Sequence, residues 1–403
     1  MHVEFFESDL VKFDFRFCFV VCLATCWLCI AGNITLAQEE KNQNPKEAAD
    51  SIPESQATES NKSASECIQL AYETSQKATS EKDFSKSKTL FLTTLSYCEN
   101  AHAAEPTDAQ RLYVSQLTSW CYVEMAKSLS NQKVISKPEE ILGYCDQAIA
   151  AHPKNWKAFA YRARCFARTN ELNKAVADLD SAIRIQSDEG TLWFNRAELN
   201  FATKQYELAA SDYSEAIKLD SNDMQAISGR GHCYVRMEDY KRALQDYNLV
   251  LERMPKCANA FISRADLHVK MKEFKAAGID YRAALKIDTS RAAAYLGVAW
   301  MYATSHEVGY YNPKVADASV KRAIELAGKE TSENLIVLAA SQAASGEYSM
   351  ARDTIKRVQE SKNRTPECDD RLAETLDAKW FIAGTGVKKS TSTAKQNNRT
   401  SKR

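Results

Sequence analysis

The sequence predicts an all-α fold, a right-handed superhelical solenoid built from helix-turn-helix hairpins. Three observations lead to this fold class. Apolar residues recur three and four positions apart, as they do on amphipathic helices. The same residue types return at a constant 34-residue interval, which is typical of stacked helical hairpins. Glycine and proline, which interrupt helices, number only 12 and 8 among 403 residues.

The repeat is clearest in four uninterrupted copies over residues 156–291. An arginine on each first helix keeps the interval (196 − 162 = 34), at Arg162, Arg196, Arg230 and Arg264. Alanines on each second helix keep it too, at Ala175, Ala209, Ala243 and Ala277. Small residues at matching positions allow the two helices of a hairpin to approach closely, so these copies form the regular part of the array.

Each copy resembles a tetratricopeptide repeat. In residues 190–223 the match falls on Trp193, Ala197, Ala209, Tyr213 and Ala216. The arginines depart from the pattern, because the family usually has an apolar residue there. Taken whole, the chain is similar to exported tetratricopeptide-repeat proteins of planctomycete-type bacteria.

The arginines have two interpretations. An aspartate recurs with each of them on the second helix, at Asp178, Asp212, Asp246 and Asp280. A guanidinium beside a buried face needs such a partner, which favours a structural ladder of ion pairs that fixes helix register. The alternative is that some arginines turn into the groove and hold a carboxylate of a ligand.

Degenerate repeats flank the regular ones. Residues 64–155 form the N-terminal repeats, with helices expected over 65–79, 83–102, 108–129 and 139–152. Residues 292–382 form divergent C-terminal repeats, in which a five-residue insertion enlarges the turn at 306–313 around Tyr310 and Tyr311. A last copy at 332–360 and a capping helix at about 367–381 close the array, as repeat proteins require. We expect one elongated domain of seven or eight hairpins.

The two ends of the chain have different compositions. Residues 1–37 have a basic region, an apolar core and a small-residue cleavage site, the order of a secretory signal peptide, or of a membrane anchor if uncleaved. Residues 38–63 are expected to be a disordered polar linker and residues 383–403 a disordered basic tail. We therefore expect export to the periplasm or cell envelope.

Eight cysteines follow the leader, and export permits disulfides among them. Cys67 and Cys98 lie on two helices of one expected hairpin, while Cys145 could meet Cys121 or Cys165. Cysteine also packs as a small buried hydrophobe, and the residues leave both interpretations open.

No pattern in the sequence indicates catalysis. The mature chain has no zinc-binding spacing, phosphate-binding glycine loop or nucleophile elbow. Net charge is zero, which gives no reason to expect nucleic acid as a partner. We expect a non-enzymatic protein with no catalytic residues, cofactor or metal.

Binding remains as the expected function. First helices line the concave surface of such arrays, and residues there that point away from the packed face can meet a partner. The candidates mix charges and aromatic groups, which suits a protein or peptide ligand. They are Lys157, Arg164, Arg168, Phe194, Glu198, Phe201, His232, Arg236, Ile262, Asp266 and Lys270. The alternative is an envelope component that binds an anionic polymer or membrane surface through its basic tail.

Overall fold

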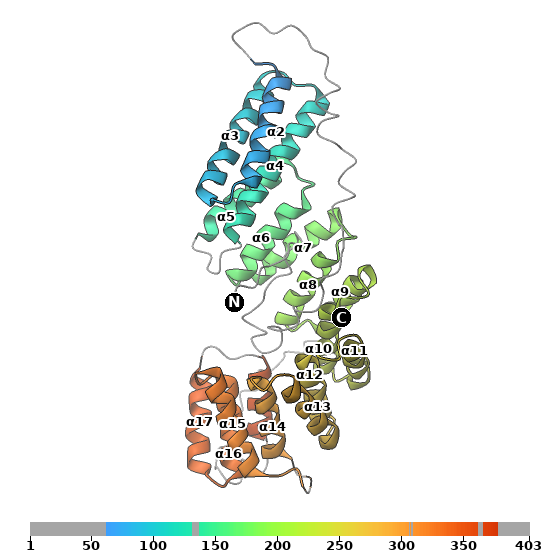
Figure 1. Cartoon of the computed structure of the whole chain (residues 1–403), viewed down its shortest axis with the longest axis vertical. Helices are drawn as coiled ribbons and strands as arrows, with labels where there is room; N and C mark the ends of the chain where they lie inside the picture. Colours follow the sequence, from blue (N-terminus) through green and yellow to red (C-terminus); the bar gives the residue numbers. More distant parts are fainter. Residues whose placement is uncertain (1–61, 131–136, 306, 308, 362–365, 378–403) are drawn as a thin grey trace, which may run out of the picture. The chain divides into compact units, whose positions relative to one another are not determined.

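A computed structural model describes residues 62–130, 137–305, 307, 309–361 and 366–377. All regular secondary structure in these residues is helical, which confirms the predicted all-α fold of hairpins (Figure 1). The expected signal peptide, the basic tail and nearly all of the polar linker lie outside the described residues. Among the helices described, none combines the length and apolar character needed to cross a membrane.

The described helices fall into two compact units, residues 62–237 and 238–377. The first unit contains α2 (Ala64–Ser80), α3 (Phe84–Ala103), α4 (Asp108–Ser130), α5 (Pro138–Ala151), α6 (Trp156–Arg168), α7 (Leu172–Ile185), α8 (Gly190–Ala202), α9 (Tyr206–Leu219) and α10 (Met224–Arg236). The second contains α11 (Tyr240–Arg253), α12 (Ala258–Lys270), α13 (Phe274–Ile287), α14 (Ala292–Thr304), α15 (Pro313–Ala327), α16 (Ser332–Ala344), α17 (Tyr348–Glu360) and α18 (Pro366–Asp377).

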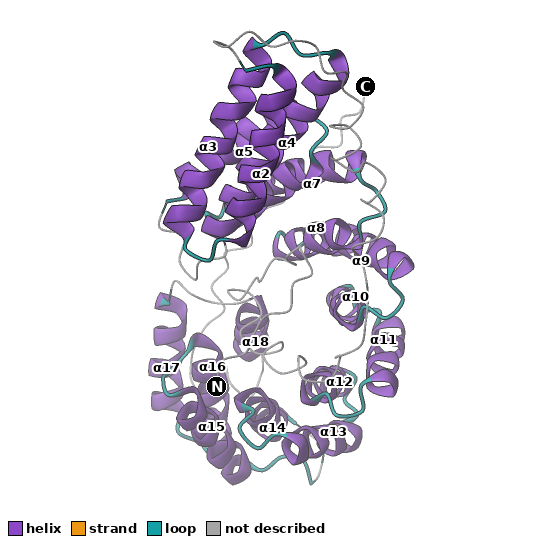
Figure 2. Cartoon of the chain, turned by 45° about the horizontal axis from the view of Figure 1, so that its top comes forward, coloured by secondary structure: helices purple, strands orange, loops and turns teal. Residues whose placement is uncertain are grey.

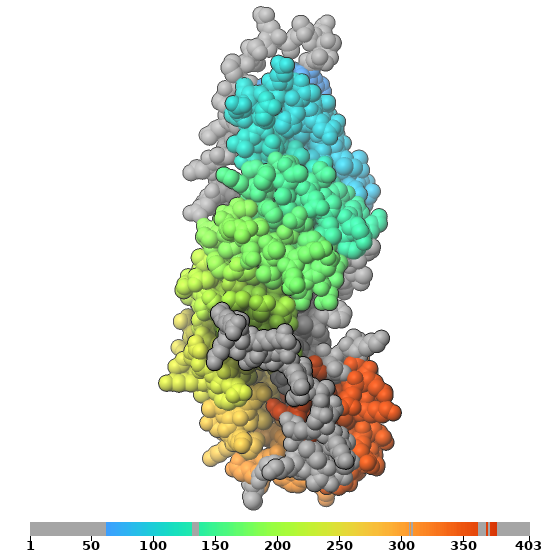
Figure 3. Space-filling view, turned by 180° about the vertical axis from the view of Figure 1, so that it is seen from behind, coloured from blue at the N-terminus to red at the C-terminus, as the bar shows by residue number. Residues whose placement is uncertain are grey.

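Consecutive helices pack as hairpins within each unit, and each hairpin packs on the next. The pairs α6 with α7, α8 with α9 and α12 with α13 are examples. Within each unit the colours of the space-filling view change gradually, because neighbours in sequence are neighbours in space (Figure 3). The alanines at the 34-residue interval are fully buried, at Ala175, Ala209, Ala243 and Ala277. The short side chains thus bring paired helices together, as the sequence predicts.

The turns inside the regular hairpins use a left-handed backbone. Asn170, Lys204, Glu238 and Lys272 have φ angles of 65°, 63°, 60° and 62°, and they keep the interval of the repeat. Gly346 takes the same role between α16 and α17, with φ at 82°. A side chain in this conformation costs energy, so the packing of the two helices must impose it.

Local sequence sets the helix ends outside the regular copies. Ser63 and Glu66 form a capping box at the start of α2, and Thr331 with Asn334 forms one at α16. Pro138 and Pro313 occupy the first positions of α5 and α15. Proline is tolerated there because the first amides of a helix have no acceptor within the helix.

The hairpins interlock through a pairing of large and small side chains. Tyr213 and Tyr281 are almost completely buried. A Cβ atom at Gly229 would lie 2.4 Å from the Tyr213 ring, and one at Gly297 would lie equally close to Tyr281. Each glycine lies on the next hairpin, at a constant spacing from its tyrosine (229 − 213 = 16 and 297 − 281 = 16). The tyrosine ring therefore fills the space where a side chain would otherwise be.

All eight cysteines of the described residues are buried, and Cys67, Cys98, Cys121, Cys145 and Cys165 are free thiols. Burial raises the pKa of Cys98 and of Cys165 to about 11. Their reactive thiolate form is therefore scarce at neutral pH. Of the two interpretations of the cysteines, the structure shows buried hydrophobes without disulfides.

The enlarged turn before α15 is fastened to its own unit. The Tyr310 ring lies 5.8 Å from Phe274 and 6.4 Å from Tyr302, measured between centroids. The Tyr311 hydroxyl donates to the Ala344 carbonyl at 2.7 Å. Both tyrosines that the insertion contributes thus have structural contacts.

Candidate partner-binding surface

Three of the ladder arginines, Arg162, Arg196 and Arg264, bind an aspartate of the same hairpin through two guanidinium nitrogens. In Arg196, Nε and Nη2 donate to the two carboxylate oxygens of Asp212 at 2.9 and 2.7 Å. Arg162 binds Asp178 in the same way, and Arg264 binds Asp280. Two parallel bonds fix the angle between the two groups as well as their distance.

A second contact joins each arginine to the preceding hairpin, which the sequence analysis missed. Nη1 of Arg196 donates to Asp180 at 2.6 Å. The acceptors for all four arginines are Asp146, Asp180, the Ser214 hydroxyl and Asn248. They also keep the interval of the repeat, but their chemistry varies. Arg230 and Asp246 belong to different compact units, and their expected pair is not described here.

These pairs lie at the border between core and solvent. The side chain of Asp212 is 6% exposed and that of Arg196 is 20% exposed. Burial raises the pKa of Asp212, while Arg196 and Asn200 partly offset that effect. A buried carboxylate of this kind depends on its cation, since it has lost most of its water. The described arginines are thus engaged within the fold and do not project into a groove.

Partly exposed side chains occupy one matching position on the first helices. It is the ninth position of each regular copy, at Arg164, Glu198 and His232 in the first unit and at Asp266 in the second. Desolvation lowers the pKa of His232 to about 4, so its imidazole is uncharged at neutral pH. The charge at this position therefore differs between copies: it is positive at Arg164, negative at Glu198, neutral at His232 and negative at Asp266. Charge varies here, while residues that hold the hairpins together repeat.

Four other candidates on the first helices are basic. Arg168 is exposed and donates to the Ser130 carbonyl at 2.8 Å. Arg236 donates to the Tyr206 hydroxyl and lies over its ring. Lys157 and Lys270 complete the group.

The three apolar candidates are buried. Phe194 and Phe201 are 5% and 7% exposed, and their rings lie edge-on to Tyr213 and Tyr206. Ile262 is 2% exposed, in the cluster that includes Tyr281 and Ala294. The candidates that remain accessible are mainly polar or charged.

In the second unit, helix α18 contacts two of the candidates. Arg371 Nη2 lies 4.0 Å from Asp266 Oδ1, and Lys270 Nζ lies 3.5 Å from Glu374 Oε1. Sequence periodicity could not reveal these contacts, because Arg371 is far from Asp266 along the chain and outside the regular repeats.

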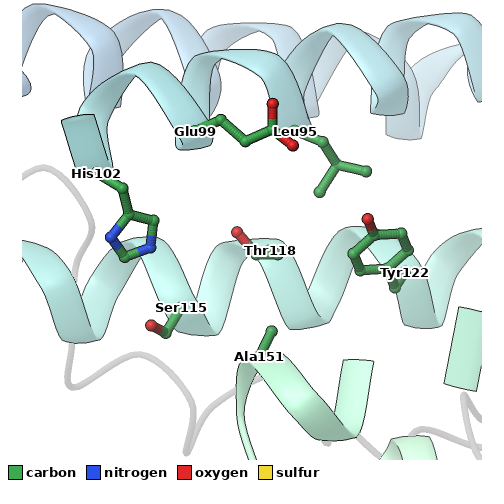
Figure 4. A pocket seen from close by; sticks show the side chains of 7 residues that line it. All are labelled: Leu95, Glu99, His102, Ser115, Thr118, Tyr122 and Ala151. Carbon is green, nitrogen blue, oxygen red and sulfur yellow. The ribbon is translucent and has the colours of Figure 1, made fainter. Parts of the chain in front are cut away.

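A pocket of about 120 Å³ lies on the first unit (Figure 4). Glu99 and His102 from α3 face Ser115 and Thr118 from α4 across it. Its volume is well below the roughly 300–1,000 Å³ of small-molecule sites. Within the residues that the structure describes, no group of three His, Cys, Asp or Glu side chains is placed to hold a metal ion.

Comparison with protein families identifies the repeats. The tetratricopeptide repeat model matches residues 143–190, 174–223 and 229–301, the region in which the 34-residue interval and the hairpins coincide. Residues 143–223 and 229–301 thus match tetratricopeptide repeats. These repeats form a scaffold of a kind typical of protein–protein interaction. No curated protein matches the sequence.

Several solved structures show a distant likeness to this chain. A tetratricopeptide-repeat protein from Parabacteroides merdae is 16% identical, with a TM-score of 0.42, over 76% of this chain and 98% of that one. PilF from Pseudomonas aeruginosa is 16% identical, with a TM-score of 0.44, over 55% and 96%. YrrB, described as having an unusual peptide-binding site, is 20% identical, with a TM-score of 0.40, over 44% and 89%. Because these scores are below 0.5, the likeness to tetratricopeptide repeats rests on the matched residues 143–223 and 229–301.

Proposed function

We propose that this tetratricopeptide-repeat protein is a non-enzymatic adaptor of the cell envelope, exported by its N-terminal segment, that binds a segment of a protein partner along its first helices. One observation carries the proposal. The ladder arginines, their aspartates and the alanines between paired helices keep their identity from copy to copy, whereas Arg164, Glu198, His232 and Asp266 differ at one partly exposed position. Because the exposed side chain at this position differs from one repeat to the next on a constant scaffold, it can favour one polypeptide sequence over others.

The accessible chemistry supports a polypeptide ligand over a polyanion. Glu198 and Asp266 repel a polyanion, while Arg164 and the neutral His232 offer a cation and a hydrogen-bonding group. A protein segment can match such a mixture because its own side chains vary in the same way.

Photocrosslinking in the native envelope tests this function. A photoreactive amino acid at position 164 or 198 should capture a discrete partner, to be identified by mass spectrometry. The same group at Leu208, an exposed residue on the second helix α9, is the matched control and should not capture it. Equal capture from all three positions would contradict the proposal.

The experiment also separates the rival function. Binding of an anionic polymer or membrane through the basic tail should weaken steeply with salt and disappear on truncation after Phe381. Groove capture should survive that truncation. Fractionation of cells that express the full chain tests the localisation, and recovery in the cytoplasm would overturn the envelope assignment.

A further inference from the structure

Helix α18 lies on the first-helix side of the second unit. In Figure 2 it is beside α14 and α16, and its apolar residues join their core. Cys368 and Leu372 are buried in the cluster that contains Trp300 and Leu335, and Leu376 packs against it. These three residues are four apart, so they form one stripe of the helix.

The flank of α18 carries charges that match the surface below. The Arg371 guanidinium lies 5.4 Å from the centre of the Trp300 ring and also faces Asp266. One turn further on, Glu374 faces Lys270. Asp266 and Lys270 are both candidates from the partner surface, and α18 complements the charge of each.

This docking has the properties of an exchangeable contact. The ion pairs are 4.0 and 3.5 Å long, and the side chain of Asp266 keeps 42% of its exposure while that of Glu374 keeps 50%. Ion pairs this exposed are weak. A 12-residue helix is also marginal alone in water, so α18 gains its helical structure largely from the surface on which it lies.

We propose that the first-helix face of the second unit, formed by α12, α14 and α16, is a binding site for an amphipathic helix of a protein partner, and that α18 is its built-in competitor. The partner helix has apolar residues at i, i+4 and i+8, a basic residue at i+3 and an acidic residue at i+6, the pattern of Cys368, Arg371, Leu372, Glu374 and Leu376. This inference rests on the proposed function and specifies the partner for one part of that surface.

The tether gives α18 a large advantage over a free helix. Five residues separate the end of α17 from the start of α18 (366 − 360 − 1 = 5). A linker this short corresponds to an effective concentration in the millimolar range. A partner helix therefore displaces α18 only when it binds the site more tightly than α18 does, or when its local concentration exceeds the effective concentration of α18. This competition makes the site selective.

The test uses the full chain and a fluorescent synthetic peptide of residues 366–377, monitored by anisotropy. Reversing both charges of α18 in the chain, Arg371→Glu with Glu374→Lys, should weaken the built-in helix and leave its site intact. The labelled peptide should then bind at least tenfold more tightly than it binds the unaltered chain. The matched control reverses an exposed pair on α17, Lys356→Glu with Glu360→Lys, and should leave peptide binding unchanged.

A second experiment covers loss of folding in the variant. A protease site inserted between α17 and α18 keeps every native residue of α18 but allows the tether to be cut. After cleavage the labelled peptide should replace the native helix within minutes, while circular dichroism stays constant. Unfolding on cleavage, or a helix that never exchanges, would show that α18 belongs permanently to the core and overturn the inference.

The outcome is independent of the partner search described above. Capture at positions 164 and 198 concerns the first unit, so it can succeed while peptide exchange fails. Peptide exchange without any capture would instead leave the helix site established and remove the proposed role of the first unit.

Discussion

At Arg196 one guanidinium serves two carboxylates on two helices. It closes its own hairpin through Asp212 and reaches the preceding hairpin through Asp180. Its face also lies 4.9 Å from the centre of the Trp193 ring, which shields it from water. An apolar residue at this position could pack against its neighbours but could not form hydrogen bonds to Asp212 and Asp180 at the same time.

Replacing this arginine should be costly. Arg196→Ala leaves Asp212 buried without its cation, and we expect a loss of about 3–5 kcal/mol in the free energy of unfolding. Urea unfolding measures the loss. Arg184→Ala, at an exposed arginine that donates to the Ser181 hydroxyl one turn away, is the control and should change stability by less than about 0.5 kcal/mol. Unchanged stability in Arg196→Ala would refute the structural role.

The same variant should be less impaired in acid. Burial raises the pKa of Asp212 even with Arg196 present, and removal of the cation raises it further. An acid whose pKa is higher in the folded state favours folding below its unfolded pKa and loses that benefit as pH rises. The stability difference between variant and wild type should therefore shrink from pH 7 towards pH 4. A difference that grew in acid would contradict this assignment.

The sequence predicts one of the two contacts of each ladder arginine, the pair with the aspartate of its own hairpin. Arginine and aspartate recur without change, so their pairing follows from the 34-residue interval. The acceptors on the preceding hairpin also keep the interval, but Asp146, Asp180, Ser214 and Asn248 share only the ability to accept a hydrogen bond. A search for repeated residue types overlooks such a position, because geometry there requires an acceptor and not one amino acid.

Between hairpins, a residue on the second helix and the residue 16 positions later, on the next first helix, vary in size together. Five pairs of residues share the spacing of 16 along the chain, and the two glycines that receive a tyrosine ring belong to two of them. The five pairs are Cys145 with Tyr161, Leu179 with Asn195, Tyr213 with Gly229, Tyr247 with Ser263, and Tyr281 with Gly297. Along this set the later residue is smaller where the earlier one is larger, as close packing requires.

Two glycines should therefore respond in opposite ways to alanine. Gly229→Ala places a methyl group against the Tyr213 ring and should cost about 1–3 kcal/mol. Gly143→Ala, inside α5 with nothing within 4 Å of its Cβ position, should stabilise the chain by about 0.5–1 kcal/mol. Thermal unfolding of the two variants provides the comparison. Destabilisation of equal size at both sites would mean that the tyrosine contact is not responsible.

Helix positions were predictable, but the turns between them were not. The helix predicted at 108–129, for example, is α4, Asp108–Ser130. The left-handed residues at 170, 204, 238 and 272 are Asn, Lys, Glu and Lys, and three of these four have no preference for that conformation. Helix packing forces it on them, and packing is not visible in local sequence.

In the whole molecule, stability should depend on neighbours. Arg196 and Gly229 act on adjacent residues of α9, since one binds Asp212 and the other receives Tyr213. The double variant Arg196→Ala with Gly229→Ala should depart from additivity by about 0.5–3 kcal/mol. Arg196→Ala with Gly297→Ala, which acts in the other compact unit, should be additive within about 0.5 kcal/mol. Urea unfolding distinguishes the two, and equal coupling would contradict a nearest-neighbour array.

The contacts of α18 mark the limit of prediction for the whole chain. Its amphipathic pattern predicts a helix at the end of the array, and a helix is present. Its position beside α14 and α16 depends on Trp300, Asp266 and Lys270, which lie far back in the sequence. No interval connects them to α18, so only the three-dimensional structure reveals that contact.

The size pairing and the arginine ladder together limit how such a chain can grow by duplication. A tandem copy of a 34-residue unit must supply an acceptor for the next arginine and a receiver small enough for the preceding large side chain. If residues 258–291 were duplicated, Arg264 of the second copy would meet Arg282 of the first copy, where it needs an acceptor. If residues 190–223 were duplicated, Asn195 of the second copy would lie where Tyr213 of the first copy needs a small residue. Residues 224–257 satisfy both conditions, with Asn248 as acceptor and Gly229 facing Tyr247. This unit is therefore the one whose duplication would lengthen the array without a new clash or an unpaired charge.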